Sequence, residues 1–246
     1  MTPDLYRRFF RKSTGRIAEL AGEDLQAGVP HIRSWNAADA IIHVGLVFSF
    51  VSQSIRQGGP IGQQGVAPWA NDPANQPARS DLEKWFATEA ETLDETIWSY
   101  QEDDEVWTSS KKIGRAKFWM RRMAQEAEMH RWDIEAAYGH SQPINPELAV
   151  DGVNEFYDFF VVERLPEAFS GEGSVHLHAT DAEGEWMITR NETGVIVENK
   201  HGKGDVAARG PASDLLLFVW NRQSHSTLET FGNTELLDEH QRLLQI

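Results

Sequence analysis

The sequence predicts a two-domain α+β protein, with a four-helix bundle over residues 1–142 and a smaller α+β domain over residues 143–246. The chain has 246 residues, which is long for one domain and short for three. Long helical patterns fill its first half, whereas short strand-like runs appear only in the second. The proline-rich Pro143-Ile-Asn-Pro146 separates the halves and marks a linker. One large domain is the alternative.

Four stretches of the first half carry helix start and stop signals. Thr2 with Pro3 begins the first, and Gly28-Val-Pro30 stops that segment. The second begins at Ser34 or Asn36, and it is apolar nearly all round, so we expect it to be buried. Ser80-Asp-Leu-Glu83 reads as a capping box for the third. The expected helices cover about 2–25, 34–57, 80–100 and 115–137, with a long loop over 58–79.

The second half mixes both kinds of element. Turn residues separate three short runs of strand-forming residues, and buried helical patterns precede and follow them. The expected helices cover 147–161, 212–220 and 234–244, and the expected strands cover 174–179, 185–189 and 194–197.

Composition excludes several classes of function. There are 38 acidic and 23 basic residues, so the net charge of −15 disfavours nucleic acid and anionic membranes as partners. There is no cysteine, which excludes disulfides, thiolate metal sites and a cysteine nucleophile. The most apolar stretch, 37–51, is too short to span a bilayer and carries Asp39 and His43. We therefore expect a cytoplasmic protein.

One helical segment carries a candidate metal site. Glu126 and His130 are four residues apart, so their side chains share one face of a helix. Taken alone, such a pair is more often an ordinary surface pair. His43 changes this balance, because a histidine within the most apolar helix needs a buried partner. It is either a hydrogen-bonded core histidine or a third ligand facing Glu126 and His130, and two histidines with one carboxylate leave open metal positions.

The chain also resembles a known family along nearly its whole length. The segment from Arg122 to Ala137 is similar to the signature helix of mycothiol-dependent maleylpyruvate isomerase-like proteins, and 34–43 to the family's tryptophan-to-histidine segment. Beyond the linker, 146–155, 179–186 and 212–222 are similar to its C-terminal domain. The resemblance implies a DinB-like four-helix bundle followed by a sterol-carrier-like α+β domain.

The resemblance also implies a reaction. It implies a divalent metal, usually zinc, held by His43, Glu126 and His130, with mycothiol binding that metal as a thiolate. In isomerase members the thiolate adds to the cis double bond of maleylpyruvate, and rotation and elimination give the trans isomer. The family pattern makes Arg222 the candidate catalytic residue for the anionic substrate; a solvated helix end is the equal alternative. The expected partners are a small thiol and a small anionic or electrophilic substrate, for a monomer or homodimer.

Two alternatives to isomerisation stay open. The same metal site would serve transfer of the thiol to an electrophile, and a metal- or ligand-binding protein without turnover is the third interpretation. The third gains weight from Gln125, since family members often carry histidine directly before the glutamate.

Two further features receive a plain interpretation. His176 and His178 alternate along a strand and share one face, but the sequence places no third ligand near them, so we expect a solvated strand face. Asp133, one turn after His130, either orients that histidine or is a surface carboxylate.

Overall fold

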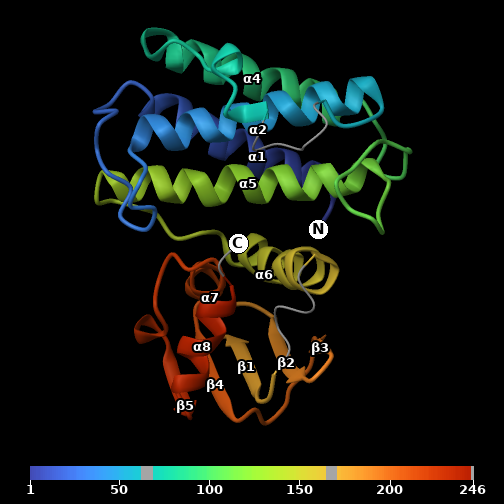
Figure 1. Ribbon diagram of the computed structural model, residues 1–246, viewed down its shortest axis with the longest axis vertical. Coiled ribbons are helices and arrows are strands. Elements are labelled where there is room, and N and C mark those ends of the chain that lie inside the picture. The colour runs from blue at the N-terminus through green and yellow to red at the C-terminus, as the bar shows by residue number, and fades with distance from the viewer. Residues whose placement is uncertain (62–68, 165–170, 245–246) are drawn as a thin grey trace. The chain divides into compact units, whose positions relative to one another are not determined.

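The computed structural model describes residues 1–61, 69–164 and 171–244 (Figure 1). The chain divides into two compact units, Met1–Gln142 and Pro143–Ile246, each described by itself below. The units are α-helical and α+β respectively, so the predicted fold class is confirmed. Part of the predicted loop over 58–79 lies outside the described residues.

The first unit is a bundle of long helices lying side by side (Figure 1). The second helix is capped by Asn36 and Asp39, whose side chains and backbone amides bond reciprocally. Gly58 ends it in the left-handed conformation that glycine adopts without strain. The helices are α1 (Pro3–Leu20), α2 (Ala37–Gln57), α4 (Leu82–Ile97) and α5 (Ala116–Ala137).

Two predicted helix boundaries in this unit are wrong. Helix α1 ends at Leu20 rather than near Leu25, because the chain turns at Gly22. The predicted capping box at Ser80 does not form, because Ser80 lies inside the short 3-10 turn η2 (Arg79–Asp81), and α4 begins after it without a side-chain cap. A first turn wound into a 3-10 helix removes the extended backbone that a capping serine needs.

Helix α2 is the core element of the bundle. It is 21 residues long and so extends beyond the apolar stretch 37–51 considered above. Within the described residues it alone has the length and hydropathy to cross a membrane. However, 78% of its most apolar window is buried by the rest of the protein. Phe48 of α2 packs between the rings of Phe10 and Phe86, which joins three helices in one aromatic core.

The second unit is built on a five-stranded mixed sheet in the order β3-β2-β1-β4-β5. Strand β1 runs parallel to β4, and every other neighbouring pair is antiparallel. Helices α7 and α8 pack on β1. The strands are β1 (Ser174–Ala179), β2 (Glu185–Asn191), β3 (Gly194–Glu198), β4 (Val206–Gly210) and β5 (Glu229–Gly232). The helices are α6 (Pro146–Glu155), a π-helical continuation (Phe156–Arg164), α7 (Ala212–Val219) and α8 (Glu235–Leu243).

The sequence correctly predicted β1, β2 and β3 but missed β4 and β5. Strand β4 reads Val-Ala-Ala-Arg-Gly, which has weak strand propensity, and β5 is only four residues long. Both strands are stabilised by pairing with their neighbours, since β4 pairs with the buried strand β1, and β5 pairs with β4 at the sheet edge. The helix predicted over 147–161 is also changed, because its second half winds as a π-helix.

Candidate metal centre

Three side chains from α2 and α5 converge in the bundle. Nε2 of His43 lies 3.5 Å from Oε1 of Glu126, and Nε2 of His130 lies 3.4 Å from the same oxygen. The two imidazole rings meet edge to face, with their centroids 5.0 Å apart. The structure therefore brings together all three residues that the sequence singled out as ligands.

Ordinary helix geometry produces this convergence. Glu126 and His130 lie one helical turn apart on α5, so they share one face, and α5 packs directly on α2. His43 lies two turns into α2, whose start is fixed by the Asn36 cap. Because the start of α2 is fixed and α2 packs on α5, the position of His43 relative to α5 is fixed as well.

Glu126 divides its two oxygens between different partners. Nη2 of the buried Arg122 lies 2.6 Å from Oε2, which leaves Oε1 facing the imidazoles. Burial raises the pKa of Glu126. The charge of His130, the hydrogen bonds to the imidazoles and the charge of Arg122 together outweigh burial, so the pKa of Glu126 lies well below its usual range. Glu126 is therefore a carboxylate with one oxygen held and one offered. The i,i+4 spacing from Arg122 to Glu126 is the sequence signal that could have revealed this partner.

His130 has a carboxylate behind it. Its Nδ1 lies 3.0 Å from Oδ2 of Asp133, which is fully buried, so the surface interpretation of Asp133 is wrong. Burial lowers the pKa of His130, but Glu126 and Asp133 together raise it to about 9. A carboxylate on the rear nitrogen fixes the ring orientation and directs Nε2 forward, as in carboxylate–histidine–metal arrangements.

His43 is more open than the sequence suggested. Its side chain is 35% exposed, whereas that of His130 is 9% exposed. The Trp35 ring covers part of the pair, with its centroid 4.8 Å from that of His43 and 6.1 Å from that of His130. A histidine on the most apolar helix here faces a partly open site rather than a sealed core.

The donor atoms have the spacing of a metal site. Ligands 2.0–2.2 Å from a tetrahedral zinc ion stand about 3.3–3.6 Å from one another. The distances of 3.4 and 3.5 Å from Glu126 Oε1 to the two imidazole nitrogens fall in this range, and all three donor atoms lie within 4.8 Å of one another. Two nitrogens and one oxygen fit a divalent metal with a position left for an outside ligand.

Comparison with known proteins places the chain. Residues 6–135 match the mycothiol maleylpyruvate isomerase N-terminal domain, and residues 147–239 match the C-terminal domain of the same family. The chain belongs to the mycothiol maleylpyruvate isomerase family. No curated protein sequence matches it.

Solved structures agree with this family in fold. The crystal structures of the mycothiol-dependent maleylpyruvate isomerase and of a mutant of it each align with a TM-score of 0.67 at 12% identity. Each alignment covers 94% of this chain and 93% of the other. At this identity the likeness establishes a shared fold across both units.

Gln125, the departure from the family pattern, is buried in α5. It directly precedes Glu126, and its side chain therefore points about 100° around the helix axis from that of Glu126. An amide is not among the usual ligands of zinc, so Gln125 adds no donor to the cluster of His43, Glu126 and His130.

Arg222 lies just after α7 in the second unit. Asn221 before it adopts the left-handed conformation, and its amide donates to the carbonyls of Gln241 and Leu244. Nη1 of Arg222 donates to the carbonyl of Trp220 at 2.9 Å, and its guanidinium lies 6.0 Å from that indole. These contacts fix the backbone that carries the arginine, and a role in substrate binding stays a prediction.

The solvated strand face predicted for the two strand histidines is wrong for His176. The side chain of His176 is only 7% exposed, and Glu185 and His201 lie beside it and His178. Glu185 is placed by the β1–β2 register and His201 by the connection after β3, neither of which the sequence showed.

Proposed function

We propose that this protein is a metal-dependent enzyme that activates an external low-molecular-weight thiol, mycothiol, and isomerises a maleylpyruvate-type acid from cis to trans. The observation that carries the proposal is the cluster of His43, Glu126 and His130, whose donor atoms have metal-ligand spacing. Family membership supports the choice of thiol and reaction class.

Zinc is the ion that we propose for these ligands. Two imidazoles and one carboxylate form one of the usual three-residue sets of catalytic zinc sites. When bound, such an ion would lower the pKa of a coordinating thiol, which is about 8.5 when free, so that the thiol would lose its proton to water and bind as a thiolate.

The residues of the chain prepare this site in three ways. Arg122 holds Oε2 of Glu126, so that one oxygen of the carboxylate faces the ion. The carboxylate of Asp133 lies 3.0 Å from the rear nitrogen of His130, and this ion pair orients the ring. Trp35 lies against both histidine rings and covers one side of them.

The absence of cysteine from the chain suits this chemistry. With no thiol of its own, the protein offers no competitor for the open position of the metal. The net charge of −15 repels an anionic substrate, so a placed cation must bind it, and we propose Arg222 for that role. A cytoplasmic enzyme acting as a monomer or homodimer is part of the same proposal.

Metal analysis tests the site directly. We expect Glu126→Gln to lose one equivalent of zinc relative to the unchanged chain, because an amide oxygen is a much weaker zinc ligand than a carboxylate. Mass spectrometry of the metal in the purified protein measures this. Glu83→Gln, at an exposed position of α4, is the matched control and should keep the full zinc content. Equal zinc in both variants would refute the site.

A reaction assay then separates the candidate activities. With mycothiol present, the purified zinc protein should convert maleylpyruvate to its trans isomer while mycothiol is recovered unchanged. Consumption of mycothiol with an electrophile, in place of isomerisation, would identify a thiol transferase. Binding of mycothiol without either reaction would identify a binding protein.

A further inference from the structure

A second cluster of metal-ligating side chains lies in the α+β unit. Within the described residues, His176, His178, Glu185 and His201 each place one donor atom within 4.8 Å of the others. Oε2 of Glu185 lies 2.9 Å from Nδ1 of His201 and 3.3 Å from Nε2 of His176, and its Oε1 lies 3.1 Å from Nδ1 of His178. Three imidazoles thus surround one carboxylate.

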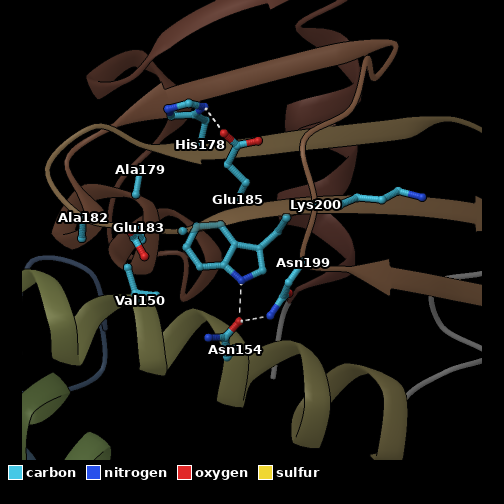
Figure 2. Close-up of a pocket in the computed structure, with 11 residues that line it drawn as sticks. Val150, Asn154, His178, Ala179, Ala182, Glu183, Glu185, Asn199 and Lys200 are labelled. Carbon is cyan, nitrogen blue, oxygen red and sulfur yellow. Dashed lines mark hydrogen bonds and ion pairs between the residues drawn. The ribbon is translucent and has the colours of Figure 1, made fainter.

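The sheet brings these ligands to one face. His176 and His178 are two apart on β1, so both point to the same side. Glu185 begins β2 directly opposite His178 in the antiparallel register, and Figure 2 shows their side chains turned toward one another. Two residues opposite each other in such a pair have Cβ atoms about 5 Å apart, close enough to share one ligand.

The connection from β3 to β4 supplies the fourth ligand. Strand β3 lies at one edge of the sheet and β4 beyond β1, so this connection must cross β2 and β1. Gly204 allows a close approach, because a Cβ there would lie 2.8 Å from the carbonyl oxygen of Val206 and 3.1 Å from the amide nitrogen of His176. His201 is thereby held over the two strand histidines, with its ring centroid 5.4 Å from that of His176.

We propose that His176, His178, Glu185 and His201 bind a divalent transition-metal ion of the zinc type. Imidazole nitrogens and a carboxylate suit zinc and its first-row neighbours. The carboxylate-to-imidazole distances of 2.9–3.3 Å are close to the 3.3–3.6 Å that separate ligands of a tetrahedral zinc ion. Four protein ligands form a closed set, which is typical of structural rather than catalytic zinc.

A metal ion could reach the proposed site from solvent and would hold the connection between β3 and β4 in place. His178 and Glu185 also line a cavity of about 490 Å³, together with Asn154, Trp186 and Asn199 (Figure 2). Two of the ligands are open to solvent, since the His201 side chain is 81% exposed and that of His178 is 36% exposed. Bound metal would fasten the crossing connection, which carries Lys200 and Lys203 on either side of His201, to β1 and β2.

Zinc titration of full-length variants tests the proposal. In Glu126→Gln, from which the bundle site is removed, one zinc equivalent should still bind, measured by competition with a chromophoric chelator. Adding His201→Ala or His178→Ala should weaken that binding by 10-fold or more. His225→Ala is the matched control and should leave binding unchanged, because His225 pairs with Asp238 at 3.2 Å and does not belong to the cluster. Should Glu126→Gln fail to fold, the same three histidine variants made in the unchanged chain give the comparison.

Proteolysis supplies an independent readout. Zinc should slow tryptic cleavage after Lys200 and Lys203 in Glu126→Gln, but not when His201→Ala is added. Equal zinc affinity in the His201→Ala, His178→Ala and His225→Ala variants would overturn the proposal, as would a lack of any zinc binding in Glu126→Gln. Loss of the bundle site alone would leave this second equivalent in place, so the two proposals fail separately.

Discussion

At the scale of single residues, two glutamates show how neighbours decide what a carboxylate does. Glu126 has one oxygen bonded to Arg122, so only the other faces His43 and His130. Glu185 differs, because both of its oxygens face imidazoles. A metal at the first proposed site would have one carboxylate oxygen as a ligand and an open position, whereas four residues would enclose a metal at the second.

Asp133 gives a test of the support behind the bundle site. Its carboxylate lies 3.0 Å from Nδ1 of His130, so Asp133→Ala should free that ring and weaken zinc binding by roughly 10–100-fold. Isothermal titration with zinc measures the change, and circular dichroism checks the fold. Asp103→Ala, at an exposed loop position paired with Lys117, should bind zinc normally. An affinity unchanged in Asp133→Ala would show that the contact does not serve the metal.

His240 makes the stability of the α+β unit depend on pH. It is fully buried, its Nε2 lies 2.8 Å from the hydroxyl of Tyr157, and burial, with the charge of Arg190, lowers its pKa to about 3. The unfolded chain takes up this proton near pH 6.5, but the folded chain does not until about pH 3. The free energy of unfolding should therefore fall as pH drops below about 6.5.

Urea unfolding at several pH values between 7.5 and 4.5 measures this dependence. His240→Gln, which cannot titrate, should show a shallower fall over the same range, whatever its stability at neutral pH. A slope equal to that of the unchanged chain would show that other groups cause the loss.

At the scale of elements, buried charges fasten α1 to α5. Arg131 lies 2.6 Å from Glu128 and 2.5 Å from Glu135, within one turn on either side along α5. From α1, Ser13 donates to Glu128 and Arg16 to Glu135. The network ties α1 to the helix that also carries Glu126 and His130, so it helps to hold these two proposed metal ligands in place.

Removing the central arginine should therefore destabilise the bundle. Arg131→Met leaves two buried carboxylates without their main partner, and we expect a loss of about 3–5 kcal/mol in the free energy of unfolding. Chemical denaturation measures it. Lys117→Met, which breaks an exposed ion pair with Asp103, should leave the free energy of unfolding almost unchanged. Similar losses in both variants would contradict the importance of the buried network.

At the scale of the whole molecule, the residues proposed for the reaction come from both units. The proposed metal ligands belong to the bundle, whereas Arg222, the proposed cation for the substrate, follows α7. Arg222→Ala should lower kcat/KM for the acid by roughly 100-fold, as expected for loss of a charge-stabilising donor, and leave the zinc content unchanged. Arg209→Ala, a half-exposed arginine of β4, is the control. Normal turnover in Arg222→Ala would remove the arginine from the proposal.

The sequence by itself determined the fold class, most of the helices, and the three side chains, His43, Glu126 and His130, that cluster at the proposed bundle site. This was possible because those signals are local: caps, apolar periodicity and an i,i+4 pair are written in neighbouring residues. Only the tertiary structure decided β4 and β5, the partial exposure of His43 and the burial of Asp133. It also decided the His176–His178–Glu185–His201 cluster, whose members are joined by strand register and by a connection crossing the sheet. Contacts between residues far apart in the chain leave no periodic trace in it, so they become visible only when the elements have packed.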